Sequence, residues 1–233
     1  MNLGKVYLLP MLLHEEGWEA IPADTTKWIQ QCDAFFVENE KTTRRYFKKL
    51  WKEMVIDNYV WHPIHKVESE QIQAFTQLLK AGKNIGIVSE AGCAGIADPG
   101  QMLVAAAQTL GAVVKPYMGP SSLLLALMGS GMNGQLFQFH GYLPIDAAER
   151  KKKIQALDAD AKQRNCTQLF IETPYRNNQM MEALIQSCHP STKICIGVDI
   201  TAPNEMIKTA TASYWKEHLP ELHKKLVVFL IGS

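Results

Sequence analysis

The chain has 233 residues, of which 47% are hydrophobic and 20% are charged. These proportions are typical of a folded globular protein and exclude an intrinsically disordered or fibrous chain. Because 24 Lys and Arg face 23 Asp and Glu, the net charge of +1 excludes a whole-chain attraction to nucleic acid or membranes. Only a local patch of cations could support such a partner.

Short apolar runs that predict strands alternate with longer amphipathic runs that predict helices. In chain order, the strands are predicted over residues 6–9, 34–37, 84–88, 112–115, 136–139, 167–171, 193–198 and 226–231. The helices are predicted over residues 25–32, 41–54, 69–81, 99–110, 120–130, 146–162, 174–187 and 212–218. This alternation favours an α/β fold with mostly parallel sheets. Turn residues at 115–120 divide the chain, so we expect two α/β domains, 1–117 and 118–233, with a ligand cleft between them.

The apolar runs and the cysteines indicate where such a protein works. The most apolar run, 122–132, is shorter than the roughly 20 residues that span a bilayer, so no membrane segment is expected. The N-terminal apolar run lacks a small-residue cleavage site and predicts a strand, not a signal peptide. The five cysteines are an odd number and include no CxxC pair, which indicates neither a disulfide framework nor a metal site. We therefore expect a reduced, cytoplasmic protein without a metal.

The most informative segment follows the strand predicted over 84–88. It reads Ser89-Glu90-Ala91-Gly92-Cys93-Ala94-Gly95-Ile96-Ala97-Asp98-Pro99-Gly100. Small residues at the carboxyl end of a parallel strand let a ligand approach the backbone, and Asp98 before Pro99 predicts the start of a helix. The spacing matches neither GxGxxG nor a Walker A loop. From spacing alone, a ligand-binding loop and a plain strand-to-helix connection remain open.

A second segment, Tyr117-Met118-Gly119-Pro120-Ser121-Ser122, also leads from a strand into a helix. Its backbone amides and two hydroxyls could hold a polar ligand at the start of the helix. A simple turn between two domains is the alternative interpretation.

Taken in order, these segments resemble the tetrapyrrole methylase superfamily, whose members use S-adenosylmethionine. The chain is most similar to the ribosomal RNA small-subunit methyltransferase I type, which methylates a cytidine 2′-hydroxyl. That similarity is carried further by Gly141-Tyr142-Leu143-Pro144 with Arg150 and by Glu172-Thr173-Pro174-Tyr175-Arg176. The resemblance implies a homodimer, supported by the apolar helix at 120–132, and a cofactor cleft between the two domains. The residues implied to line that cleft are Pro10, Ala91, Gly92, Cys93, Ile96, Ser121, Ser122, Glu172 and Ile200.

Three motifs depart from the family pattern. In the central segment, Glu90, Cys93 and Ala94 replace the family's Asp, Thr and Pro. The family's first loop, Pro-Thr-Pro-Ile-Gly-Asn, reads Pro10-Met11-Leu12-Leu13-His14-Glu15 here, and its Glu-Asp-Thr-Arg reads Glu38-Asn39-Glu40-Lys41. The last two departures fall where the resemblance places the acceptor. Three acceptor hypotheses therefore stay open: ribosomal RNA or the small ribosomal subunit, a tetrapyrrole or other small molecule, and a non-catalytic relative that binds cofactor or RNA.

Transfer of a methyl group to a ribose hydroxyl would benefit from a general base. The candidates are acidic residues near strand ends, and the sequence does not choose among them: Glu38, Glu90, Glu172 and Asp199.

One predicted helix carries six cations within an arc of about 140°, at roughly 100° per residue. The cations are Lys41, Arg44, Arg45, Lys48, Lys49 and Lys52, and apolar residues fill the opposite side. Such a stripe suits a phosphate backbone, although a solvated amphipathic helix is the simpler alternative. A second cluster begins at Arg150 and could extend the RNA-binding surface.

Overall fold

The computed structural model describes residues 2–64, 68–97 and 99–232. It divides into two compact units, Met1–Ser121 and Ser122–Ser233, four residues beyond the boundary expected at Tyr117. Each unit has its own sheet, helices and hydrophobic core. The prediction of two α/β domains is therefore confirmed at the level of the fold.

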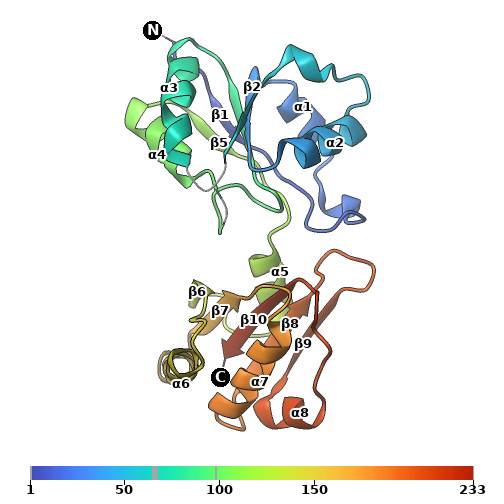
Figure 1. Cartoon of the computed structure of the whole chain (residues 1–233), viewed down its shortest axis with the longest axis vertical. Coiled ribbons are helices and arrows are strands. Elements are labelled where there is room, and N and C mark those ends of the chain that lie inside the picture. The colour runs from blue at the N-terminus through green and yellow to red at the C-terminus, as the bar shows by residue number, and fades with distance from the viewer. Residues whose placement is uncertain (1, 65–67, 98, 233) are drawn as a thin grey trace. The chain divides into compact units, whose positions relative to one another are not determined.

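The first unit is a five-stranded parallel sheet with helices on both faces (Figure 1). Its strand order is β3-β2-β4-β1-β5. The strands are β1 (Val6–Leu8), β2 (Ala34–Val37), β3 (Val60–Pro63), β4 (Ile85–Val88) and β5 (Val114–Pro116). The helices are α1 (Thr25–Ile29), α2 (Glu40–Leu50), α3 (Ile72–Lys80) and α4 (Gln101–Leu110), with 3-10 turns at η1 (Trp18–Ala20), η2 (Ile56–Asn58) and η3 (Glu68–Gln71).

Side-chain alternation along these strands supplies two separate cores. Val6 and Phe36 point to the face covered by α3 and α4, and the neighbouring Tyr7 and Phe35 point to the face covered by α1 and α2. Because a strand buried on both faces needs apolar residues at every position, β2 and β4 read as continuous apolar runs. That is why the sequence predicted them well.

The second unit is built on a mixed sheet with the order β6-β7-β10-β8-β9. Its elements in chain order are α5 (Ser122–Ser130), β6 (Phe137–Tyr142), α6 (Ala147–Arg164), β7 (Thr167–Ile171), α7 (Asn177–Ser187), β8 (Lys193–Val198), β9 (Met206–Thr211), α8 (Ala212–Glu217) and β10 (Val227–Gly232). Only β6 and β7 pair in parallel. The expectation of mostly parallel sheets is wrong for this unit, because β8 and β9 form a hairpin and β10 inserts between β7 and β8.

Helices cover both faces of this sheet as well. Ile154 of α6, Met181 of α7 and Trp215 of α8 share one core with the strands. On the opposite face, α5 packs against β8, β9 and β10. The helix lies so close that a Cβ added at Gly197 would stand 3.1 Å from the Cβ of Ala126.

The eight predicted helices and eight predicted strands are all present; the bounds of β2, β7 and β8 are as predicted, and the other elements have shifted ends. The sequence missed β3 and β9, which are edge strands of their sheets. Edge strands tolerate Pro63 at the end of β3 and a lysine in β9, and these residues weakened the strand pattern.

The sequence predicted which segments form helices better than it predicted the residues at which the helices begin. Asp146 caps α6 as expected, accepting hydrogen bonds from the amides of Ala148 at 3.0 Å and Glu149 at 2.9 Å. The α4 helix begins at Gln101, two residues after the predicted start, because Gly100 before it has a φ of +122°. The predicted cap Asp98 lies outside the described residues.

In the part of the chain that the structure describes, no helix is long and apolar enough to cross a membrane. The five cysteines all lie in that part, and they form no disulfide with one another.

Candidate functional site

The carboxyl ends of β1, β2, β4 and β5 share one edge of the first sheet, because all its strands are parallel. The central strands β1 and β4 are neighbours, but the chain leaves β1 for α1 on one face of the sheet and leaves β4 for α4 on the opposite face. Loops that diverge in this way open a crevice, which is where open α/β sheets bind ligands. We call the segments that follow β1, β4 and β5 at this edge the carboxyl-edge loops.

The carboxyl-edge loops bond directly to one another. Pro10 and Cys93 form an isolated antiparallel bridge, and the amide of Met11 donates to the carbonyl of Gly92 at 2.9 Å. The Cys93 thiol donates to the carbonyl oxygens of residues 119–120, each at 3.6 Å. The family-like segments at residues 10, 89–100 and 117–122 are therefore brought together by the fold.

Two glycines allow this close meeting of backbones. Gly92 has a φ of +70°, which side-chain-bearing residues rarely adopt. Gly119 packs so tightly that an added Cβ would lie 2.2 Å from the Cβ of Pro10. The loops consequently present backbone atoms, rather than bulky side chains, at the edge of the sheet.

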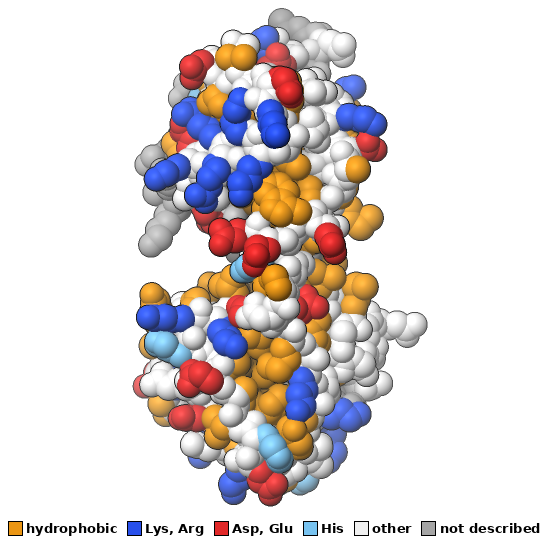
Figure 2. Space-filling view, turned by 90° about the vertical axis from the view of Figure 1, so that its right-hand side faces the viewer, with side chains coloured by type: hydrophobic (Ala, Val, Ile, Leu, Met, Phe, Trp, Pro, Cys, Tyr) orange, Lys and Arg blue, Asp and Glu red, His pale blue; other side chains and the backbone are white. Residues whose placement is uncertain are grey.

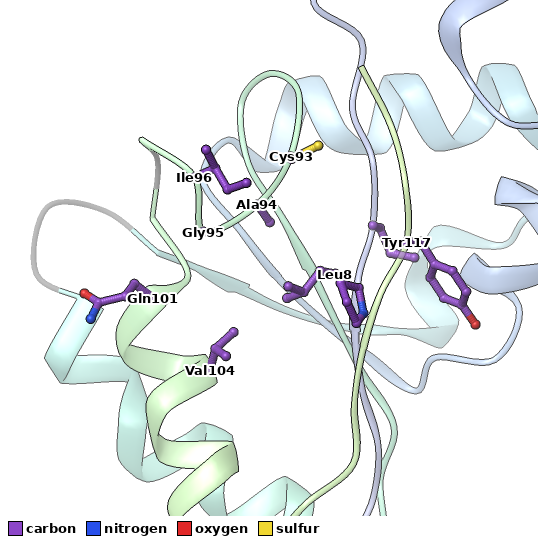
Figure 3. Close-up of a pocket in the computed structure, with 10 residues that line it drawn as sticks. Leu8, Cys93, Ala94, Gly95, Ile96, Gln101, Val104 and Tyr117 are labelled. Carbon is purple, nitrogen blue, oxygen red and sulfur yellow. The ribbon is translucent and has the colours of Figure 1, made fainter. Parts of the chain in front are cut away.

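A pocket of about 290 Å³ lies beside the loop that follows β4 (Figure 3). Figure 3 shows Ala94 and Ile96 on that loop and Val104 on α4 among its walls. Its lining is mostly apolar and comprises Leu8, Leu9, Cys93, Ala94, Gly95, Ile96, Gln101, Val104, Pro116 and Tyr117. The pocket offers room for an apolar part of a ligand next to polar backbone.

The residues predicted to bind a cofactor fall into both units. In the first unit they all belong to the carboxyl-edge loops: Pro10, Ala91, Gly92, Cys93, Ile96 and the buried Ser121. In the second unit, Ser122 begins α5, Glu172 directly follows β7, and Ile200 follows β8 by two residues. Because β7 and β8 are both antiparallel to β10, Glu172 and Ile200 lie at the same edge of the second sheet.

The turn that contains Ile200 is strained. Asp199 and Thr201 have φ angles of +46° and +72°, although neither is glycine. The Asp199 carboxylate stabilises the turn by accepting hydrogen bonds from the amide of Leu226 at 3.0 Å and from Asn204 Nδ2 at 3.1 Å. The Thr201 hydroxyl oxygen is buried and makes no hydrogen bond with any described residue. Such strain and an unpaired buried hydroxyl are typical of a ligand-binding turn.

Three of the four candidate general bases have structural partners. Glu38 Oε2 accepts from the amide of Glu90 at 2.7 Å, and the Asp199 carboxylate is engaged as described. Glu172 is buried, and its Oε1 accepts from the amide of Thr173 and from Arg176 Nη2, both at 2.6 Å. Glu90 is exposed, and its carboxylate makes no hydrogen bond with the residues that the structure describes.

Half of the cations predicted to form a stripe on α2 interact with the protein itself. Arg44 pairs with Glu40 at 2.5 Å, and its guanidinium lies 4.9 Å from the centre of the Trp61 ring. The ammonium of Lys48 donates to the carbonyl oxygens of residues 52 and 54 just beyond the helix. The ammonium of Lys49 lies 5.4 Å from the centre of the Trp18 ring.

The remaining three are exposed, as Lys48 and Lys49 also are, but their side chains make no hydrogen bond, ion pair or ring contact with a described residue: Lys41, Arg45 and Lys52. Lys52 lies just beyond α2, because the helix ends at Leu50 and not at residue 54 as predicted. Figure 2, a view of the side on which α1 and α2 lie, shows Lys and Arg side chains gathered on the first unit. The prediction that Arg150 extends the RNA-binding surface is wrong. Arg150 is buried, and its Nη1 donates to the carbonyl of Ile145 at 2.8 Å. Arg150 thus holds the loop before α6 and adds nothing to an exposed basic surface.

Comparison with protein-family models matches residues 17–214 to the family described as Tetrapyrrole (Corrin/Porphyrin) Methylases. Among curated proteins, the chain is 32% identical over 188 residues to "Ribosomal RNA small subunit methyltransferase I" of Bacillus subtilis, covering 79% of this chain and 60% of that protein. It is 32% identical over 140 residues to the protein of the same name from Mesorhizobium japonicum, covering 60% of this chain and 46% of that protein. The chain thus spans about half the length of the curated relatives it matches.

Solved structures share the fold. The crystal structure of the methyltransferase CobJ matches with a TM-score of 0.66 at 16% identity, covering 99% of this chain and 94% of that one. Uroporphyrin-III C-methyl transferase from Thermus thermophilus, complexed with S-adenyl homocysteine, matches with a TM-score of 0.59 at 14% identity, covering 99% and 98%. At these identities the likeness concerns the arrangement of the elements alone.

Proposed function

The chain belongs to the tetrapyrrole methylase family, and from this premise we propose that it is an S-adenosylmethionine-dependent methyltransferase whose acceptor is a ribose 2′-hydroxyl of small-subunit ribosomal RNA. The observation that carries the proposal is the meeting of the family-like segments in the carboxyl-edge loops, beside a helix with exposed cations. The ribosomal acceptor is supported by the names of the curated relatives.

The chemistry of the residues fits such a cofactor. S-adenosylmethionine, when bound, supplies a methyl group on a positively charged sulfur, so the protein mainly has to align donor and acceptor. In the first unit, Gly92 and its neighbours would hold polar groups through the backbone, and the pocket next to Cys93 and Ile96 suits apolar ones. In the second unit, the Thr201 hydroxyl lacks a hydrogen-bond partner among the described residues, and a ligand would supply one. The roles of Ser122, Glu172 and Ile200 towards the cofactor remain predictions from the family resemblance.

We propose that RNA meets the first unit along α2. This helix begins three residues after β2 ends, so its first turn lies at the same edge of the sheet as the carboxyl-edge loops. Lys41, Arg45 and Lys52 would contact phosphates, because their side chains make no hydrogen bond, ion pair or ring contact with a described residue. Glu90 would take the proton from the attacking hydroxyl, because its carboxylate is exposed at that edge.

We also propose that the protein is a homodimer in the cytoplasm and that its second unit forms the interface. Large apolar side chains are exposed there, with Met128 of α5 78% exposed, Leu124 48% and Phe137 of β6 43%. Strand β6 is also an edge strand, whose outer backbone groups have no partner strand in the sheet. An apolar surface of this kind on a water-exposed unit is typical of an interface between protein chains.

The test is methyl transfer from labelled S-adenosylmethionine to three acceptors in parallel: small-subunit ribosomal RNA, a tetrapyrrole such as uroporphyrinogen, and no acceptor. We expect label in RNA only, recovered as a 2′-O-methyl nucleoside after digestion. Label in the tetrapyrrole but not in RNA would show that the acceptor is a tetrapyrrole and not ribosomal RNA. Failure to bind S-adenosylmethionine or S-adenosylhomocysteine in calorimetry would refute the proposed function itself.

A further inference from the structure

The inner side of α2 carries Tyr46, whose role the proposed function leaves open. Tyr46 is 3% exposed, and its hydroxyl donates to the carbonyl oxygen of Pro10 at 3.1 Å. Burial raises the pKa of this phenol well above its ordinary value, so the hydroxyl keeps its proton and remains a donor. A buried tyrosine hydroxyl normally has a partner, and here that partner is backbone of a carboxyl-edge loop.

The bonded peptide group has a second partner. The peptide between Pro10 and Met11 accepts from Tyr46 through its carbonyl and donates through its amide to the carbonyl of Gly92 at 2.9 Å. A continuous chain of hydrogen bonds therefore runs from α2 through this peptide to the loop that follows β4. These two bonds, one at the carbonyl and one at the amide, orient the peptide between α2 and the loop that follows β4.

The loop that follows β4 is also held at Glu90, two residues before Gly92, by a side chain from the segment that joins β2 to α2. Glu38, between β2 and α2, accepts from the amide of Glu90 through Oε2 at 2.7 Å. Between these two attachments, the buried Ser89 hydroxyl donates to the carbonyl of Ala91 at 2.9 Å. The segment 90–92 is thus held at its first amide by Glu38 and at its last carbonyl, through Met11 and Pro10, by Tyr46.

We propose that Tyr46, together with Glu38, is a positioning residue that clamps segment 90–92 in the conformation that binds the cofactor. The inference rests on the proposed function, because it takes this segment to be part of the cofactor site. Neither residue needs to touch the cofactor; each acts through backbone that does. The helix with the exposed cations would then also set the geometry of the cofactor loop.

The test uses Tyr46→Phe, which removes one oxygen atom and keeps the ring in the core. We expect the Met11 amide to exchange with solvent faster and the affinity for S-adenosylhomocysteine to fall about five- to tenfold, the effect of losing one buried hydrogen bond. Glu38→Met, which keeps the length of the side chain and removes both acceptor oxygens, should lower the affinity in the same direction while loosening the Glu90 amide, and it covers the case in which Tyr46→Phe fails to fold. In steady-state kinetics, the KM for S-adenosylmethionine should rise more than kcat falls.

Tyr59→Phe is the matched control. Tyr59 belongs to the same aromatic core, and its hydroxyl makes no hydrogen bond with a described residue, so its removal should leave the affinity unchanged. An affinity of Tyr46→Phe within twofold of wild type would overturn the positioning role, even if the Met11 amide exchanged faster. If the wild-type protein bound no S-adenosylhomocysteine, the proposed function would fail, and the exchange of the Met11 amide alone would decide whether the clamp exists.

Discussion

The RNA contact along α2 can be tested by removing the exposed cations whose side chains make no contact with a described residue, Lys41 and Arg45 on α2 and Lys52 just after it. The triple change of Lys41, Arg45 and Lys52 to Ala removes three charges without breaking an ion pair among the described residues. For a single strand, each neutralised phosphate contributes about −0.7 to the slope of log K against log salt, so the slope should become less negative by about 2. Between 50 and 200 mM salt, a fourfold change, wild type should therefore lose about 20-fold more affinity than the variant.

The assay is a filter-binding salt series on small-subunit ribosomal RNA. Its matched control is the triple change of Lys5, Lys80 and Lys83 to Ala, which removes the same charge from the opposite edge of the first sheet. These lysines are exposed and precede β1 or β4 or end α3, and only Lys83 has a described carboxylate partner, Asp33 at 3.2 Å. Exposed pairs of that kind contribute about 1 kcal/mol or less to stability, so the control should fold normally.

The control separates a local contact from a general effect of net charge. If both triple variants change the slope equally, RNA responds to the total charge and α2 is not its contact surface. An unchanged slope in the α2 variant would refute the reasoning outright, because then none of the three exposed cations neutralises a phosphate. Affinity for S-adenosylhomocysteine should stay at the wild-type value in both variants.

Three further predictions address the base, the core and the assembly. Glu90→Gln should lower kcat for RNA methylation by about 10²- to 10⁴-fold and leave the affinity for S-adenosylhomocysteine unchanged. A variant with the wild-type kcat would show that Glu90 is not the general base. Arg176→Met should lower the free energy of unfolding by about 3–5 kcal/mol in urea titrations, because it leaves the buried Glu172 carboxylate without its ion-pair partner. The control is Arg164→Met, which breaks the more exposed pair between Arg164 and Asp160. A similar loss of unfolding free energy in both variants would contradict the role of burial. Met128→Glu should convert a dimer into a 26.2 kDa monomer in light scattering, whereas a persistent dimer would move the interface elsewhere.

The sequence alone determined the features that depend on local periodicity. Continuous apolar runs identified β2 and β4, because a strand buried on both faces needs an apolar residue at every position. The Asp146 cap was readable because a capping side chain bonds to amides only two and three residues away. The ordered motifs at residues 10, 89–100 and 119–122 identified the family, since their order survives even where single residues differ.

Only the tertiary structure decided which charges are available and which residues hold the loops. Six cations share one face of the helix predicted over 41–54, yet Arg44 and Lys49 lie over rings from other elements and Lys48 donates to carbonyl oxygens beyond the end of α2. Arg150 reads as part of a basic cluster but is buried. Tyr46 reads as one more apolar-face residue, and nothing in its neighbours along the chain points to Pro10, 36 positions away. Helical periodicity shows which side of a helix is buried, but the partner of a buried polar group depends on long-range packing, which no local pattern contains.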